Sequence, residues 1–179
     1  MTDISSNQQI HLQSLPQVEE MDLQSLSPRY RVLNIQISLI LWGALALISA
    51  IVHWQPLFEL SSTVADVSFF ATFCLIFISI SGATYHFFAD PKKQYAIREH
   101  DVHFHSGLFF RRLVSQPIMR IQHIEIARGP IERSAGLATL QVYSAGGANH
   151  AFQIPGLVHE QAIQLRQYIL DHKDVKENG

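Results

Sequence analysis

Two long apolar stretches dominate the pattern of hydrophobic and polar positions along the chain. They cover residues 33–54 and 67–89, and neither contains an Asp, Glu, Lys or Arg. At a rise of 1.5 Å per residue, each would be roughly 33 Å long as an α-helix, enough to cross the hydrocarbon core of a bilayer. A helix satisfies the backbone polar groups of such a segment in lipid. The pattern predicts a two-helix transmembrane hairpin, because the alternative, a buried hairpin of a soluble protein, would have shorter and amphipathic helices.

After Pro91 the apolar positions alternate with polar ones, as in half-buried strands. Residues 94–98 and 102–105 predict a β-hairpin that turns at 99–101, and Gly107 predicts a bend before a strand over 108–115. Three further strands are expected. Their inward positions are Ile124 and Ile126, Leu140 and Val142, and Phe152 and Ile154, and the breaks after them are Gly129-Pro130, Gly146-Gly147 and Pro155-Gly156.

From Leu157 the apolar spacing becomes helical again. Val158, Ala162, Leu165 and Ile169 form one stripe, which predicts a terminal amphipathic helix. Short strands followed by one helix indicate an α+β domain, a small antiparallel β-sandwich or barrel capped by the C-terminal helix. The predicted organisation is a flexible arm at 1–28 with a short helix near 18–26, the hairpin at 29–91, the soluble domain at 92–172 and a polar tail at 173–179.

Charge predicts the orientation of the hairpin. Arg29 and Arg31 precede the first span, Lys92 and Lys93 follow the second, and the loop at 55–66 contains no Lys or Arg. The positive-inside rule then places both termini in the cytoplasm and the loop outside, in a multi-pass protein of the bacterial inner (plasma) membrane. The acidic flank and the length of the first apolar stretch argue against a cleaved signal peptide, so we expect this span to be retained.

Small residues on both spans favour close helix packing in lipid. They are Gly43, Ala44, Ala46, Ser49 and Ala50 on the first, and Ser79, Ser81, Gly82 and Ala83 on the second. His53 and His86 lie at the ends of the spans, where a proton or ion pathway would use ionisable groups. No charged residue accompanies them within the spans, and both lie near an interface, so a transport role is not favoured.

Composition argues against several classes of function. The formal net charge is −2, and the cations of the last half are mixed with acids, which argues against a nucleic-acid partner. The single cysteine, Cys74, lies within a span and allows no disulfide framework. No nucleophile elbow, phosphate loop or HExxH motif occurs, so we expect a protein that is not an enzyme and holds no cofactor.

A series of short motifs follows the spans in a fixed order. They are Tyr95-Ala96-Ile97, Val102 to Leu108, Pro117 to Gln122, Glu132 to Leu140, Gly146 and Ile154 to Leu157. Together with the two spans and the terminal helix, they resemble the bacterial membrane-flanked domain family, whose soluble part is pleckstrin-homology-like (PH-like). The resemblance covers roughly residues 29–170. It implies a cytoplasmic soluble domain and brings no catalytic residue.

Within these motifs we assign structural roles to Arg120, Ile121, Gln122, Arg133, Gly136, Pro155 and Gly156. The guanidinium groups of Arg120 and Arg133 would hold loop carbonyls or the carboxylates of Glu125 or Glu132. Binding of an acidic partner is the alternative, because the same five-donor fork suits phosphate.

His100, His103 and His105 form the most conspicuous candidate site. Imidazole is a common zinc ligand, and His103 and His105 would share one face of a strand. A bound metal needs three or four ligands, and only Glu99 and Asp101 accompany the histidines. We therefore favour an exposed strand face and predict no metal site.

Lys92, Lys93, Arg111 and Arg112 are the candidates for contact with anionic lipid. Specific headgroup recognition is not predicted, because no loop clusters enough cations. We expect a non-enzymatic interaction or assembly module whose partners are the bilayer and either a second copy or a larger membrane protein of the same family. The alternatives are a component of envelope stress defence that handles lipids, peptides or small molecules, and a subunit of a transport complex.

Overall fold

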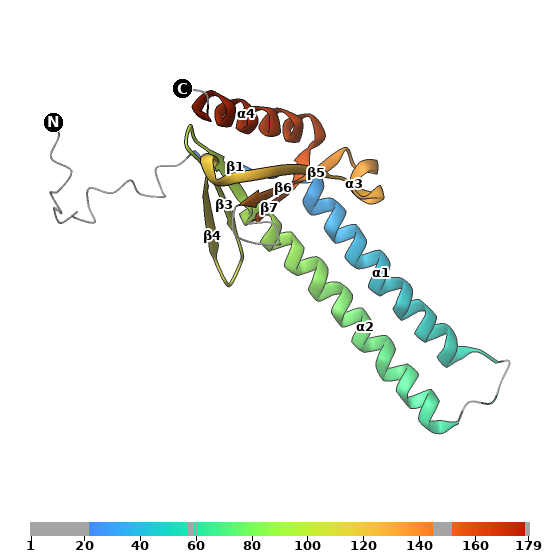
Figure 1. Ribbon diagram of the computed structural model, residues 1–179. Helices are drawn as coiled ribbons and strands as arrows, with labels where there is room; N and C mark the ends of the chain where they lie inside the picture. Colours follow the sequence, from blue (N-terminus) through green and yellow to red (C-terminus); the bar gives the residue numbers. More distant parts are fainter. Residues whose placement is uncertain (1–21, 57–58, 60, 145–151, 178–179) are drawn as a thin grey trace, which may run out of the picture.

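The protein consists of a long helical hairpin and a small β-rich domain at one end of it (Figure 1). The computed structural model describes residues 22–56, 59, 61–144 and 152–177, with side chains described as far as residue 172. The predicted arm before residue 22, the predicted Gly146-Gly147 turn and the last two residues lie outside this part of the chain.

Both predicted spans are helical, and both helices begin earlier than the apolar pattern does. Helix α1 covers Pro28–Trp54, and α2 covers Ser62–Ala89. Proline is well suited to the first position of a helix, because its fixed φ matches and its missing N–H would have no partner there. The apolar pattern locates the part of each helix that crosses lipid, and the polar first turns lie outside that part.

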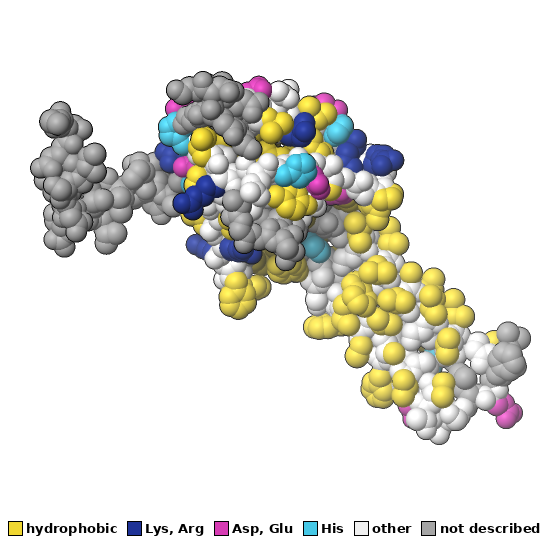
Figure 2. Space-filling model, viewed as in Figure 1, with side chains coloured by type: hydrophobic (Ala, Val, Ile, Leu, Met, Phe, Trp, Pro, Cys, Tyr) yellow, Lys and Arg dark blue, Asp and Glu magenta, His cyan; other side chains and the backbone are white. Residues whose placement is uncertain are grey.

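The two helices pack against each other through small and hydroxyl residues, as predicted. Ser38 and Ala46 of α1 and Ser68 and Ser79 of α2 are buried between them. A Cβ on Gly82 would lie 2.5 Å from Ser38 Oγ, so the backbones are close at this point. The remaining surface of the hairpin exposes large Leu, Ile and Phe side chains (Figure 2). So continuous an apolar surface is typical of helices that face lipid, and it favours the transmembrane hairpin over the soluble alternative.

The first sheet contains four antiparallel strands in the order β1-β2-β3-β4. They are β1 (Gln24–Ser25), β2 (Gln94–Ile97), β3 (Asp101–Ser106) and β4 (Arg112–Pro117). Strands β2 and β3 form the predicted hairpin. The prediction of a helix near 18–26 is wrong at its described end, because β1 pairs with β2 there.

The described end of the arm, residues 22–28, is therefore not separate from the soluble domain. Strand β1 precedes α1, β2 follows α2, and Leu26 is 8% exposed within the domain core. The predicted boundaries at 28 and 92 must be corrected: the transmembrane hairpin is inserted between the first two strands of one sheet. Leu26 follows directly after β1. Because β1 pairs along the edge of β2, Leu26 is placed within the hydrophobic core of the domain.

The second sheet contains β5 (Ile121–Ala127), β6 (Leu137–Ser144) and β7 (Phe152–Val158), which pair antiparallel in that order. A short 3-10 turn, Ile118–Arg120, leads into β5, and helix α3 (Pro130–Ser134) connects β5 to β6. Pro155-Gly156 does not end β7 as predicted. The pairing with β6 shifts there, so these two residues form a bulge within the strand.

Helix α4 (His159–Glu177) covers the core between the sheets (Figure 1). Ala162 and Ile169 of the predicted stripe are fully buried, and Leu165 is packed against the same core. The helix continues to Glu177, so most of the predicted polar tail is helical. Polar composition does not end the helix, because polar residues such as Lys and Glu have favourable helix propensities. The predicted fold class, a transmembrane hairpin with an α+β domain capped by a C-terminal helix, is confirmed.

Candidate membrane-facing site

Asp90 is the centre of a polar cluster where the helical hairpin enters the domain. It begins the short 3-10 turn Asp90–Lys92, and it is 3% exposed. One carboxylate oxygen accepts hydrogen bonds from Asn34 Nδ2 at 2.8 Å and interacts with His86 Nδ1 at 3.2 Å. The other accepts a hydrogen bond from Lys93 Nζ at 2.9 Å. A single buried carboxylate thus ties α1, α2 and the start of β2 together.

Lys93 belongs to this cluster rather than to the lipid-facing surface predicted for it. Its ammonium lies 5.0 Å from the centre of the Tyr30 ring and 3.4 Å from the Tyr30 hydroxyl. Burial alone would lower the pKa of Lys93, but the hydrogen bond to Asp90 and the electrostatic attraction of Tyr30 and Asp90 outweigh burial and raise that pKa above its ordinary value. The charge of Lys93 is therefore held inside the junction.

The start of α1 packs directly on the bulge of β7. The Ser27 N–H donates a hydrogen bond to the Gly156 carbonyl oxygen at 3.1 Å. Gly156 has φ +66°, and a Cβ at this position would overlap the Tyr30 ring. Only glycine allows both the backbone conformation and the close approach of the helix. This contact gives the Pro155-Gly156 motif a structural role that strand breaking alone would not explain.

Gly136 marks a second contact between the motif residues and α1. It has φ +70° after helix α3, and its carbonyl oxygen accepts a hydrogen bond from the N–H of His159 at 3.1 Å. A Cβ added to Gly136 would lie 3.6 Å from the guanidinium of Arg29. Arg31, two residues further along α1, stacks over the Phe87 ring of α2 at 5.0 Å. Arg31 thus links α1 to α2, whereas Lys93 contributes to the junction through Asp90 and Tyr30.

The contacts predicted for Arg120 and Arg133 do not form among the described residues. Glu132 instead accepts hydrogen bonds from the Gly129 N–H at 2.9 Å and from Thr139 Oγ1 at 2.8 Å. Both arginine side chains are exposed, as is Gln122, whereas Ile121 is buried in the core. Arg128 instead binds a backbone carbonyl: its Nε donates a hydrogen bond to the carbonyl oxygen of Leu137, the first residue of β6, at 3.0 Å.

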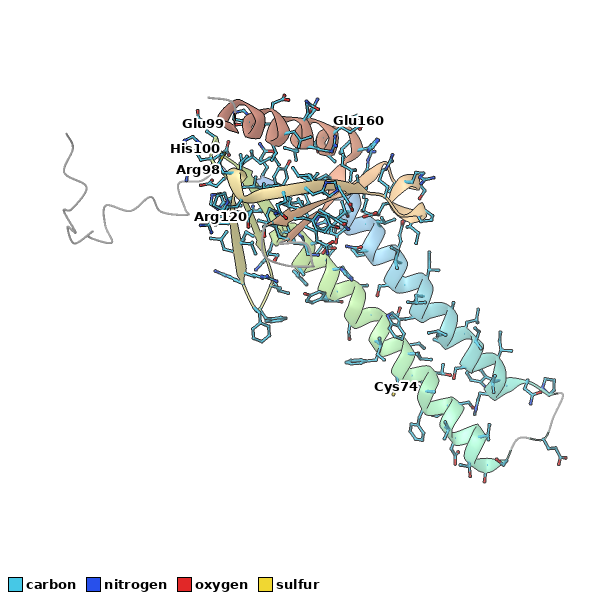
Figure 3. The ribbon with its side chains drawn as sticks, in the orientation of Figure 1. Cys74, Arg98, Glu99, His100, Arg120 and Glu160 are labelled. Atoms are coloured by element: carbon cyan, nitrogen blue, oxygen red, sulfur yellow. The ribbon has the colours of Figure 1, made fainter. Side chains whose placement is uncertain are left out.

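The three predicted histidines do not come together. His103 is 5% exposed, with Nδ1 2.6 Å from Ser115 Oγ and Nε2 2.7 Å from Asp101 Oδ1. Both ring nitrogens are thus used within the sheet, so His103 does not lie on an exposed strand face as expected. His100 lies in the β2–β3 turn with Glu99, on the side of the domain away from the hairpin helices α1 and α2 (Figure 3). Among the described residues, no group of three His, Cys, Asp or Glu side chains is arranged to hold a metal ion.

Three of the four cations predicted to contact lipid are exposed. Arg111 and Arg112 are exposed just before and at the start of β4, and Lys92 is exposed at the end of the 3-10 turn that follows α2. The β3–β4 hairpin projects from the domain beside α2 and in the direction of the membrane helices, with apolar side chains at its tip (Figures 1 and 2). Phe109 and Phe110 form that tip and are 81% and 94% exposed. The sequence interpretation missed them because two phenylalanines within a predicted strand read as core residues.

Comparison with known proteins agrees with this architecture. The sequence matches the family described as "Bacterial PH domain" over residues 11–173. It is 33% identical over 76 residues to the UPF0699 transmembrane protein YdbS of Bacillus subtilis, which is 42% of this chain and 46% of that protein. The match thus spans a little under half the length of that relative.

A more distant likeness is to a solved structure from Shewanella loihica, a DUF1696 family protein with a pleckstrin-homology domain. It covers 45% of this chain and 70% of the other, with a TM-score of 0.37 and 10% sequence identity. The family match, in contrast, extends from the arm before α1 to the terminal helix and includes both spans. The chain therefore belongs to the bacterial PH domain family.

Proposed function

We propose that this protein presents its PH-like domain at the cytoplasmic face of the bacterial inner membrane as a non-enzymatic module for protein interaction and assembly. The orientation follows from the cations, which lie on the domain side of both spans, while residues 32–91 contain none. The buried titratable groups Asp90 and His103 are engaged in structural hydrogen bonds, which supports a binding role over a catalytic one.

The edge strand β4 is the observation that carries this proposal. It is the last strand of its sheet and pairs only with β3 among the described residues. Natural edge strands are commonly protected by charged residues or proline on the edge, by short length, by bulges or by a covering element. Here the one charge, Arg112, and the one proline, Pro117, stand at the two ends, and Leu113 to Gln116 between them carry neither. Such an edge can accept an extended segment of another protein through backbone hydrogen bonds.

The membrane restricts which partner can use that edge. β4 begins beside α2 and leads away from the membrane to Pro117, next to the β2–β3 turn. In two copies inserted the same way in one bilayer, both β4 strands lead away from the membrane. A two-fold axis along the membrane normal would therefore place the two β4 strands parallel to each other. A symmetric strand ladder requires antiparallel pairing of the same edge. The edge therefore suits a segment of a different chain better than a second β4, and a larger membrane protein of the same family is the partner we propose over a homo-oligomer.

Copurification from gently solubilised membranes tests this function. The native chain should recover a membrane partner at constant stoichiometry. A Leu113→Lys substitution should abolish recovery, because lysine at an edge strand blocks further pairing. Ile163→Lys is the matched control, since it places the same charge on an exposed apolar position of α4, and it should leave recovery unchanged. A clean monomer from native membranes, or equal loss in both variants, would reject the proposal.

A further inference from the structure

The tip of the β3–β4 hairpin has the form of a built projection. Strand pairing ends at Ser106 and Arg112, so the tip consists of residues 107–111. Gly107 has φ +109°, and a Cβ there would lie 2.8 Å from the carbonyl carbon of Phe110. Glycine thus allows the chain to fold tightly back on itself. In this turn Phe110 is almost fully exposed, and Phe109 keeps most of its surface exposed.

The neighbouring helix gives the depth of the tip relative to the membrane. Leu108 and Phe109 line a groove of about 340 Å³ together with Ile80, Thr84 and Phe88 of α2. Ile80 lies nine residues before the end of α2, which corresponds to about 13 Å along a helix. The uncharged segment that ends α2, residues 67–89, is about 34 Å long and therefore slightly exceeds the hydrocarbon core. The level of Ile80 to Thr84 thus lies inside the bilayer.

The residues next to the tip match the layers of a membrane surface. Arg111 and Arg112 follow the two phenylalanines immediately, and both side chains are exposed. They lie between the tip of the hairpin and the paired part of β4. In the orientation that α2 imposes, the rings reach the acyl chains while the guanidinium groups reach the level of the phosphates. In Figure 2 the hydrophobic tip protrudes below the domain, with Lys and Arg side chains above it.

We infer that the β3–β4 hairpin is a third membrane element, whose Phe109-Phe110 tip inserts into the cytoplasmic leaflet beside α2. The occupant of this surface is lipid and not a protein, because the tip lies beside the membrane-spanning part of α2, where lipid is the surrounding medium. The hairpin thus fixes the base of β4 at the bilayer, independently of which partner binds the edge.

Site-directed spin labelling of the full chain in vesicles of phosphatidylethanolamine and phosphatidylglycerol tests this inference. Cys74 is the only cysteine, so Cys74→Ser provides a background for single labels. Phe110→Cys places the label at the tip, and Ile163→Cys places it on the exposed face of α4 as the control. Both positions are exposed, so neither substitution disturbs the core. The measurement is the collision rate of the label with oxygen, which partitions into lipid, and with a water-soluble nickel chelate.

At residue 110 the label should collide more often with oxygen than with nickel, and at residue 163 the order should be reversed. Frequent nickel collisions at residue 110 would show that the tip remains in water and would overturn the inference. Low collision rates with both reagents would show that protein covers the tip, which would overturn it equally.

Discussion

At the scale of single residues, Asp90 is the group on which the junction depends most. Its removal would leave the Asn34 amide without its partner and the Lys93 ammonium with Tyr30 alone, in a largely buried place. We expect Asp90→Ala to lower the free energy of unfolding by roughly 1–3 kcal/mol, because Lys93 can still turn partly to solvent. Thermal unfolding in detergent measures this, with the exposed Glu99→Gln as control. Equal melting temperatures for Asp90→Ala and the native chain would contradict the role given to Asp90.

The raised pKa of Lys93 predicts a pH dependence with a definite sign. A lysine whose folded pKa exceeds its ordinary value of 10.5 stabilises the folded state below that value, and this contribution is lost as the pH rises through the folded pKa. The native chain should therefore be more stable than Lys93→Gln at pH 8, and the difference should shrink as the pH rises beyond 10.5 and through the folded pKa. Parallel melting curves over a pH series measure it. A difference that grows with pH would be inconsistent with the charged Asp90–Lys93 pair.

Gly156 joins the domain to α1 through its backbone conformation. Gly156→Ala forces a side chain into a left-handed conformation and against the Tyr30 ring. We expect a loss of roughly 2–4 kcal/mol of stability, seen as a lower melting temperature and faster proteolysis between α1 and the domain. Gly129→Ala is the control, since Gly129 has φ −69° and an added Cβ would meet only an ordinary contact. The prediction fails if the two variants melt alike.

At the scale of elements, the insertion of the hairpin between β1 and β2 means that residues before the first span belong to the domain core. Leu26→Ala should cost about 2–4 kcal/mol, the usual range for a large-to-small change at a buried position. Ser25→Ala, one residue away on exposed β1, should cost little. Chemical unfolding of the full chain in detergent distinguishes the two. If Leu26 instead belonged to an independent arm, both changes would be neutral.

The elements show what periodicity can and cannot predict. The spans, the β2–β3 hairpin and the stripe on α4 were predictable, because each repeats its pattern over several turns or strand positions. Strand β1 was not predictable, because a stretch of two residues is too short to show a periodic pattern. These residues form a strand because they pair with β2, about 70 residues further along the chain. The prediction that Pro155-Gly156 ends the strand was wrong, because proline and glycine occur both where a strand ends and where a bulge interrupts its pairing.

At the scale of the whole molecule, the candidate site was predicted only in part. Charge pointed to Lys92, Lys93, Arg111 and Arg112, yet only the fold shows that Lys93 is turned inward to Asp90. The exposed Phe109-Phe110 pair was missed, because a hydrophobic pattern cannot distinguish a buried face from one that meets lipid. A Gly107 that permits the turn and two arginines directly after the aromatic pair were the signals that could have found it.

The orientation proposed for the whole molecule predicts the outcome of reporter fusions. A reporter that is active only in the cytoplasm should be active when fused after Gly179, and one that is active only in the periplasm should be active when inserted next to Glu59 in the loop between α1 and α2. Both expectations follow from the cations on the domain side of the spans. The opposite pair of activities would invert the topology and would remove the domain from the cytoplasmic face.

The central claim is that the domain, held against the bilayer by the hairpin, offers β4 to a protein partner. Photo-crosslinking in living cells tests it most directly, with a photoreactive amino acid at Leu113 on β4 and, as control, at Ile163 on α4. The account predicts one discrete crosslinked product from residue 113 and none from residue 163. Absence of a protein adduct at residue 113, or the same products from both positions, would contradict it.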